Sequence, residues 1–345
     1  MHGSTPTTMR AAVISEIGAA PEIVEVPVPT RGTGEALVRV SASALQPVDL
    51  IVATGRFYDG LPDVPFTPGL EAIGTVVEAE TLAPGTRVRV EIVHPGYGID
   101  GGCSEYVVVP EAPTGNGDRH QTSLQVVAGS ELSDELLAAI GSSGGTAWRL
   151  LEIARAHGAE ITGARVLVLG ATGVVGEILV RLLKSHGAGT VVACGRNERR
   201  LSYLTNNGAD AAVALRGQEL GSLTDEFVAA GGGQFDLVFD PLWGEPAAAA
   251  FDGIAGSGVM INFGGSAGLR APLAGVPLRA RKASLVGYSG ARSTPAERMA
   301  ATEAILAEAA AGRTAVAFDV LPLSEIAAAW ERQAESPGCK LVIRP

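Results

Sequence analysis

The chain has 345 residues, of which 46% are hydrophobic and 18% charged, and its formal net charge is −11. This length exceeds one ordinary hydrophobic core, so we expect two domains. The acidic balance, without a basic stripe, argues against a nucleic-acid-binding protein. Three widely separated cysteines, no apolar run of membrane-spanning length and no secretory signal in the first residues favour a soluble cytoplasmic protein without a membrane partner.

The first part of the chain, residues 10–110, consists of short valine-rich runs separated by glycine and proline, a pattern typical of a small β-barrel. Both Val-Arg-Val runs, at 38–40 and 88–90, alternate strictly. This alternation predicts that the valines face the core and that Arg39 and Arg89 face solvent. A helix is expected to begin at Ser133, whose side chain can cap the acidic first turn.

From residue 165 onward, short apolar runs alternate with amphipathic segments, which predicts a parallel sheet covered by helices on both faces. The expected strands are 166–169, 191–194, 211–214, 237–239, 259–262 and 284–286. At the end of the chain we expect a strand, a helix capped by Ser324 and a last strand, at 316–321, 324–336 and 340–343. The predicted α/β protein therefore divides into residues 1–132 with 316–345, and residues 133–315.

A glycine-rich turn follows the strand predicted at 166–169. Gly170 permits a tight turn, Gly173 lets backbone amides approach a pyrophosphate, and Gly176 allows close packing of the helix on the strand. An ordinary strand-to-helix turn is the alternative, but strand, glycine spacing and helix agree. We therefore predict a dinucleotide-binding turn formed by Gly170, Ala171, Thr172, Gly173, Val174 and Val175.

The next strand is followed by Gly195, Arg196 and Asn197, without the acidic residue that would hold an unphosphorylated ribose. Arg196 can bind a 2′-phosphate with its forked donors, Asn197 offers a further polar contact, and Arg200 can close the other side. We therefore predict NADPH rather than NADH. The alternative is a solvated helix start, which we accept for Arg199.

Several motifs together resemble one enzyme superfamily. They are Gln46-Pro47-Val48-Asp49, the stretches 68–74, 101–106 and 338–342, Thr146-Ala147-Trp148 and the glycine turn. Over nearly its whole length the chain resembles the medium-chain dehydrogenase/reductase superfamily, and specifically its zinc-free quinone oxidoreductase, or zeta-crystallin-like, branch. The resemblance implies a GroES-like β-barrel catalytic domain, a Rossmann doubly wound parallel-sheet domain for the cofactor, and a homodimer.

The resemblance also implies that the protein needs no metal. Zinc-dependent relatives have a cysteine where this chain reads Leu45-Gln46 and a His-Glu pair where it reads Leu70-Glu71, and their four-cysteine lobe is missing here. Without a Lewis acid, hydride transfer to a simple ketone needs another group that stabilises the alkoxide. A conjugated acceptor spreads this charge, so we predict reduction of a quinone, enone or related small molecule.

The resemblance places further residues at the site. Phe263, Gly264, Gly265 and Ser266 are expected near the nicotinamide, with Thr146 and Lys340 near the cofactor, although Thr146 could instead cap a helix and Lys340 could lie on the surface. Gln46 and Tyr58 are the candidate catalytic residues, and the expected substrate pocket comprises Gln46, Tyr58, His94, Tyr97 and Tyr288. Loop or packing roles remain alternatives for Gln46, Tyr58 and His94, and a subunit contact remains one for Tyr288. An acyl-thioester enoyl reductase, a zinc-independent alcohol dehydrogenase and a non-catalytic NADPH-binding or structural protein remain alternative functions.

Overall fold

The computed structural model describes residues 5–58, 60–114, 121–127 and 130–345, so part of the N-terminal segment assessed for a signal lies outside it. Within these residues the chain forms two compact units, each described here by itself. The barrel unit comprises Met1–Ser142, Ser293–Leu306 and Val316–Pro345. The sheet unit comprises Ser143–Arg292 and Ala307–Ala315. Among the described helices, none has both the length and the apolar character needed to cross a membrane.

These boundaries differ from the predicted ones because two long helices are divided. The helix α2, Asp134–Ala156, begins within the barrel unit, where the Ser142 amide donates to Glu71 Oε2 at 2.8 Å. The helix α8, Pro295–Ala310, likewise begins there. The predicted cap of α2 is confirmed, since Ser133 Oγ accepts from the Leu136 amide at 3.2 Å.

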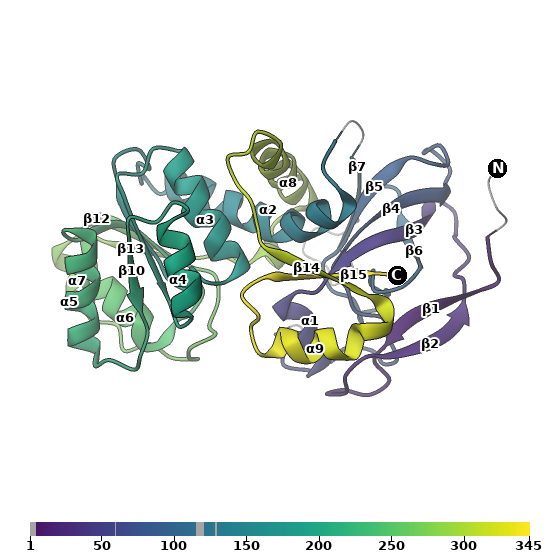
Figure 1. Cartoon of the computed structure of the whole chain (residues 1–345), viewed down its shortest axis with the longest axis horizontal. Helices are drawn as coiled ribbons and strands as arrows, with labels where there is room; N and C mark the ends of the chain where they lie inside the picture. The colour runs from purple at the N-terminus through teal and green to yellow at the C-terminus, as the bar shows by residue number, and fades with distance from the viewer. Residues whose placement is uncertain (1–4, 59, 115–120, 128–129) are drawn as a thin grey trace. The chain divides into compact units, whose positions relative to one another are not determined.

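The barrel unit is built around a seven-stranded sheet. Its strand order is β14-β15-β3-β4-β5-β7, and β6 pairs with β3. The strands are β3 Glu35–Ala44, β4 Glu71–Glu78, β5 Arg87–Ile92, β6 Tyr106–Pro110, β7 Thr122–Val126, β14 Phe318–Pro322 and β15 Lys340–Arg344, beside a separate pair of β1 Thr8–Val13 and β2 Glu22–Pro27 (Figure 1).

The alternation predicted for the two Val-Arg-Val runs holds in only one of them. On β3, Val38 and Val40 are buried and Arg39 is exposed, as expected. On β5, Arg89 is 1% exposed, so its predicted place on the solvent face is wrong. Both faces of β5 are covered, and Arg89 is accommodated because carboxylates pair with its charge.

Two helices pack on the hydrophobic core of the barrel unit. These are α1, Pro47–Ala53, and α9, Ile326–Ala334. The predicted cap at Ser324 is wrong: a 3₁₀ turn, Leu323–Glu325, precedes α9, and α9 has no side-chain cap. This turn places Leu323 and Ile326, each 1% exposed, in the same core, which explains why the chain tightens before the helix.

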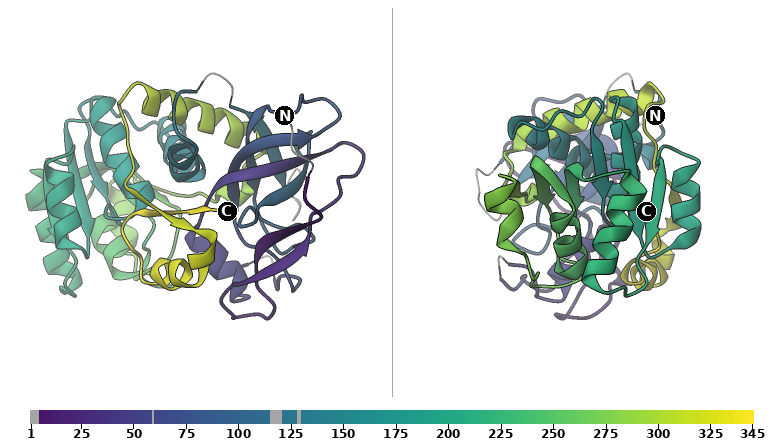
Figure 2. Two further views of the ribbon diagram at one scale, coloured as in Figure 1. Left: turned by 45° about the vertical axis from the view of Figure 1, so that its right-hand side comes forward. Right: turned by 90° about the vertical axis from the view of Figure 1, so that its left-hand side faces the viewer.

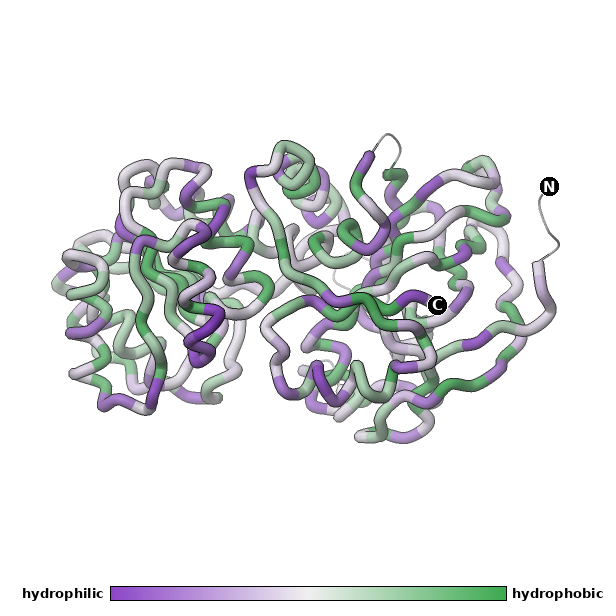
Figure 3. The backbone as a smooth tube through the Cα atoms, in the orientation of Figure 1, coloured by the Kyte–Doolittle hydropathy of each residue, from purple (hydrophilic) through white to green (hydrophobic). Residues whose placement is uncertain are grey.

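The sheet unit contains a six-stranded parallel sheet in the order β10-β9-β8-β11-β12-β13. All six predicted strands are confirmed as β8 Arg165–Val168, β9 Thr190–Gly195, β10 Ala211–Ala214, β11 Phe235–Asp240, β12 Ile254–Asn262 and β13 Ser284–Gly287. The helices that flank the sheet are α3 Val174–Ser185, α4 Glu198–Thr205, α5 Leu220–Gly231, α6 Gly244–Asp252 and α7 Gly275–Ala280 (Figure 2). The strands are predominantly hydrophobic (Figure 3), as parallel strands covered on both faces require.

Candidate functional site

The glycine turn connects β8 to α3, whose N-cap is Gly173. Gly170 has φ +61°, and a Cβ there would lie 2.7 Å from Pro241 Cγ. A Cβ at Gly176 would lie 2.5 Å from the Ala171 Cα, so local structure requires glycine at both positions. At Gly173, which has φ −88°, a Cβ would meet only the Gly170 carbonyl oxygen, at 3.4 Å. The fold itself therefore tolerates a side chain at Gly173, and the space beside it suits a close-lying ligand.

This turn lies where the strand order of the sheet reverses, between β8 and β11. Ligands of doubly wound sheets bind at the carboxyl ends of the strands at such a point. The loops that follow β8, β11 and β12 meet here. Pro241 approaches Gly170 on one side, and on the other its carbonyl oxygen is 2.6 Å from where a Cβ of Gly264 would lie.

A buried carboxylate fixes the two loops after β11 and β12. Asp240 Oδ1 accepts from the amides of Leu242 and Trp243 at 2.8 and 2.9 Å, and its Oδ2 accepts from Asn262 Nδ2 at 2.7 Å. Burial raises the pKa of Asp240 above its ordinary value. The Phe263 amide donates to the Asp240 carbonyl oxygen at 2.9 Å. Asp240 thus organises the strand ends.

The predicted nicotinamide loop, residues 263–266, therefore lies beside the glycine turn. The Ser266 amide donates to the Pro241 carbonyl oxygen at 3.2 Å, and Pro241 also contacts the turn, as described above. The structure thus brings two of the predicted cofactor-binding segments together at one edge of the sheet.

The third segment, at the end of β9, also adjoins the turn. The Ala171 amide donates to the Cys194 carbonyl oxygen at 2.8 Å, and a Cβ at Gly195 would lie 2.7 Å from Thr172 Cγ2. Arg196 is exposed, and among the described residues it has no hydrogen bond or ion pair. Asn197 Oδ1 caps α4 by accepting from the Arg200 amide at 3.1 Å. Arg196 is thus the positive charge after β9 that is available to bind an anion.

Arg200 differs from the prediction. Its Nη2 lies 2.5 Å from Oε2 of Glu177, a residue of α3 that is 1% exposed. Its guanidinium also lies over the ring of Tyr203, with Cζ 4.9 Å from the ring centroid. Glu177 was not among the predicted site residues, although a carboxylate in the otherwise apolar first turn of α3 is a signal of a paired charge.

Three of the predicted pocket residues form an aromatic cluster with Phe57 in the barrel unit. The Phe57 ring centroid lies 4.2 Å from that of Tyr58 and 4.8 Å from that of His94, and the His94 centroid lies 6.0 Å from that of Tyr97. Tyr58 is 59% exposed, whereas His94 and Tyr97 are buried. A purely solvated loop histidine is therefore excluded for His94.

The remaining predicted residues have separate positions. Gln46 is buried at the start of α1, and its amide donates to Asp49 Oδ2 at 2.7 Å. Tyr288 follows β13 in the sheet unit, with its amide 2.8 Å from the Asn262 carbonyl oxygen. Thr146 lies inside α2, so its alternative role as a helix N-cap is excluded.

Buried charges in the barrel unit form a cluster that the sequence reasoning missed. Arg89 contacts Glu71 through Nε and lies 3.2 Å from Glu91 Oε1 through Nη2. Acidic residues within apolar strands, as in Leu70-Glu71-Ala72, were the available signal. Because unpaired buried charges are costly, these residues stabilise one another as a set.

Lys340 belongs to this buried region and is 2% exposed, so the surface role considered for it is wrong. Burial lowers the pKa of its ammonium to about 8, although the charges of Glu71 and Asp49 act in the opposite direction. Burial also raises the pKa of Asp49 to about 6, against hydrogen bonds from the amides of Gln46 and Gly69. The predicted contact of Lys340 with a cofactor stays a prediction.

Two family models match the chain. Residues 32–115 match the alcohol dehydrogenase GroES-like domain, and residues 174–307 match the family described as zinc-binding dehydrogenase. Together they span more than half of the sequence and fall on the barrel and on the nucleotide-binding sheet, respectively. The chain belongs to the medium-chain dehydrogenase/reductase superfamily. The predicted GroES-like and Rossmann domain types are thereby confirmed.

Known members of the superfamily resemble the chain over much of its length. It is 25% identical over 240 residues to an NAD-dependent alcohol dehydrogenase of Sulfolobus acidocaldarius, covering 61% of this chain and 65% of that protein. It is 27% identical over 247 residues to the 2-methylene-furan-3-one reductase of Solanum lycopersicum, covering 69% and 58%. The chain thus spans less than two thirds of the length of these relatives.

A mycobacterial protein solved in complex with NADPH has the same fold, with a TM-score of 0.79, 21% identity and coverage of 98% of this chain and 100% of that chain. Other similar proteins are named as quinone oxidoreductases and prostaglandin reductases. These names agree with the predicted quinone oxidoreductase branch of the medium-chain dehydrogenase/reductase superfamily.

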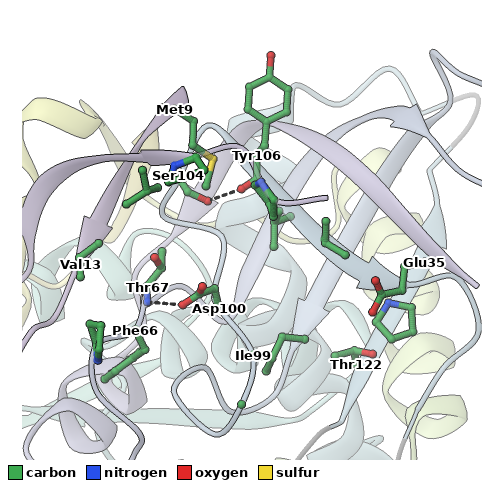
Figure 4. A pocket seen from close by; sticks show the side chains of 18 of the residues that line it. Met9, Val13, Glu35, Phe66, Thr67, Ile99, Asp100, Ser104, Tyr106 and Thr122 are labelled. Atoms are coloured by element: carbon green, nitrogen blue, oxygen red, sulfur yellow. Dashed lines mark hydrogen bonds between the residues drawn. The ribbon is translucent and has the colours of Figure 1, made fainter. Parts of the chain in front are cut away.

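Two further features of this superfamily member bear on ligands. Across the described ranges, no group of three or more His, Cys, Asp or Glu side chains is arranged to hold a metal ion. In the barrel unit, a cavity of about 600 Å³ lies between the β1–β2 pair, β6 and the loop around Ile99 (Figure 4). Thr67 and Asp100, joined by a 2.8 Å hydrogen bond, lie on its wall. None of the predicted substrate-pocket residues lines this cavity.

Proposed function

We propose that the protein is an NADPH-dependent, zinc-independent reductase that transfers hydride to a quinone, an enone or a related activated small molecule. The observation that carries the proposal is the arrangement of the turn and the end of β9. Gly173 leaves open space at the N-terminus of α3. Arg196, at the neighbouring end of β9, is exposed and has no hydrogen bond or ion pair among the described residues. A diphosphate fits the first feature, and a 2′-phosphate fits the second.

The residues present fit a dinucleotide. Glycine is needed at 170 and 176 to shape the turn, and the first amides of α3, those of Val174 and Val175, have no partner within the helix. These amides would hold the diphosphate, while the loop 263–266 would lie along the nicotinamide and Thr146 near its ribose. When bound, NADPH supplies the hydride.

We propose that the phenol of Tyr58 donates the proton that the acceptor takes up after hydride transfer. This side chain is the exposed member of the aromatic cluster, so a small molecule can reach it. Its ring packs on Phe57, which in turn contacts the buried His94. Gln46 would orient the acceptor oxygen. A conjugated acceptor spreads the negative charge that develops on reduction, so hydrogen bonds can stabilise it without a metal.

The similar proteins support the coarse assignment more strongly than the choice of cofactor. A fold relative was solved with NADPH, and the Solanum lycopersicum relative is named 2-methylene-furan-3-one reductase, but another relative is named as NAD-dependent. The choice of NADPH therefore rests on Arg196. A homodimer, predicted from the resemblance, is compatible with the position of β13 at an edge of the sheet.

The decisive experiment has two stages. Titration with NADPH and NADH, followed by protein fluorescence and melting temperature, should show tighter binding of NADPH, and Arg196→Met should weaken NADPH by about tenfold or more with little effect on NADH. NADPH consumption is then measured with quinones, enones, acyl thioesters and simple ketones, each with and without a zinc chelator. Binding of neither nucleotide would sink the proposal, and consumption confined to acyl thioesters or blocked by the chelator would replace it.

A further inference from the structure

A buried charged group lies in the first turn of α3, the helix whose N-terminus is proposed to hold the diphosphate. Glu177, one turn into α3, is 1% exposed, and its Oε2 contacts Arg200 Nη2 at 2.5 Å. Its Oε1 lies 3.6 Å from Arg181 Nη2. Arg181 Nη2 also donates to the Tyr203 hydroxyl at 2.7 Å, and both guanidinium groups lie against the Tyr203 ring. We call these four residues the Glu177 cluster.

The Glu177 cluster determines what Arg200 can do. Arg200 is in the first turn of α4, three residues after Asn197, which accepts from its backbone amide. Its side chain could in principle serve a phosphate at this helix start. However, withdrawing it would leave Glu177 with a buried charge that has lost its nearest cation, and this is strongly unfavourable.

Arg196 has the opposite character. It lies at the end of β9, is exposed, and has neither a hydrogen bond nor an ion pair among the described residues. Its guanidinium is therefore available to an incoming anion without breaking an existing interaction. The two arginines, four positions apart, thus differ: Arg196 is available to bind an anion, whereas Arg200 is paired with Glu177.

We propose that Glu177 is a specificity-determining residue, which holds Arg200 away from the adenosine 2′-phosphate and thereby limits the preference for NADPH over NADH. This inference rests on the proposed function. It makes Glu177 a positioning residue that acts through Arg200. Removing the carboxylate charge frees a forked cation at the start of α4 and removes a negative charge from the first turn of α3, and both changes favour the nucleotide with the additional phosphate.

The test compares four variants of the full chain by their Kd values for NADPH and NADH and for the fragments 2′,5′-ADP and 5′-AMP. Glu177→Gln should raise the preference for the phosphorylated member of each pair about tenfold, and Arg200→Met alone should change it less than about twofold. In the double variant Glu177→Gln/Arg200→Met, the increased preference for the phosphorylated nucleotide should disappear. Glu198→Gln is the matched control, because it removes the same charge from α4 but breaks only an exposed pair with Arg216, and it should have little effect.

Several outcomes would overturn the inference. An unchanged preference in Glu177→Gln, a gain that survives in the double variant, or an equal gain in Glu198→Gln would each do so. A loss in Arg200→Met as large as that in Arg196→Met would also overturn it, and this comparison remains decisive if Glu177→Gln fails to fold. Failure of the wild-type protein to bind either nucleotide would instead refute the proposed function, which separates the two results.

Discussion

Arg298 Nε donates to Glu91 Oε2 at 2.9 Å, although the two residues are 207 positions apart in the sequence. The same guanidinium donates through Nη1 to Gln121 Oε1 at 2.8 Å. Burial alone would raise the pKa of Glu91, but the charges of Arg89 and Arg298 outweigh it and hold this pKa below its ordinary value. The contact attaches the first half of α8 to the barrel unit and explains why the chain divides within that helix.

Replacing Arg298 should therefore destabilise the barrel unit. Arg298→Met retains much of the side-chain volume but removes one of the two cations paired with Glu91, which we expect to cost about 3 kcal/mol of unfolding free energy. Denaturant unfolding measures this loss. Arg332→Met is the control, because Arg332 pairs with Asp319 where both side chains are largely exposed, and its removal should leave the melting temperature nearly unchanged. Equal effects of both substitutions would contradict the role assigned to Arg298.

Two glycines of the same turn should separate stability from binding. Gly176→Ala forces a Cβ against the Ala171 backbone and should cost about 1–3 kcal/mol of stability. Gly173→Ala meets only the Gly170 carbonyl oxygen, at 3.4 Å, so the melting temperature should stay close to that of the wild type. It should nevertheless weaken NADPH binding about tenfold or more, because the new methyl group occupies the space assigned to the diphosphate. Full NADPH affinity in a folded Gly173→Ala protein would show that the diphosphate does not bind at this turn.

The sheet unit was predictable because its signals are local. An apolar strand, glycines three residues apart and a following helix lie within 166–176, and the structure requires glycine at two of those positions for reasons confined to the turn. The six strand positions were likewise predictable, because fully buried parallel strands are marked by apolar runs.

The buried charges were not predictable from local pattern. The alternation around Arg89 is the same as that around Arg39, yet only Arg89 is buried, because Glu71 from β4 and Glu91 from β5 supply its counter-charges. Likewise, the sequence placed Arg200 beside Arg196 but could not show that Glu177 lies within reach of Arg200. Whether such a side chain is buried depends on partners from separate elements, and the alternation along one strand carries no information about those partners.

Asp49 should make stability depend on pH. Its folded pKa of about 6 exceeds the ordinary 3.8, so the folded state binds more protons between these values, and the associated stabilisation is lost as the pH rises through 6. Asp49→Asn does not titrate. Between pH 4 and 7, the stability of the variant relative to wild type should therefore improve by about 2.5 kcal/mol, at roughly 1.4 kcal/mol per pKa unit. Lys340, with a pKa of about 8, stays protonated over this range. Urea unfolding at several pH values measures the difference, and a constant difference would show that Asp49 does not titrate in this window.

Tyr58 should affect turnover without affecting folding. Because its side chain is 59% exposed, Tyr58→Phe removes a hydroxyl at little cost in stability. If this hydroxyl donates the proton, kcat with an enone should fall about 100-fold, the lower end of the usual range for a general acid, while the Kd for NADPH stays unchanged. Tyr97→Phe is the matched control: its hydroxyl donates to the Gly60 carbonyl oxygen at 2.7 Å, so its loss should cost about 1 kcal/mol of stability and change kcat much less. A fall in kcat that is larger in Tyr97→Phe than in Tyr58→Phe would transfer the proton-donating role away from Tyr58.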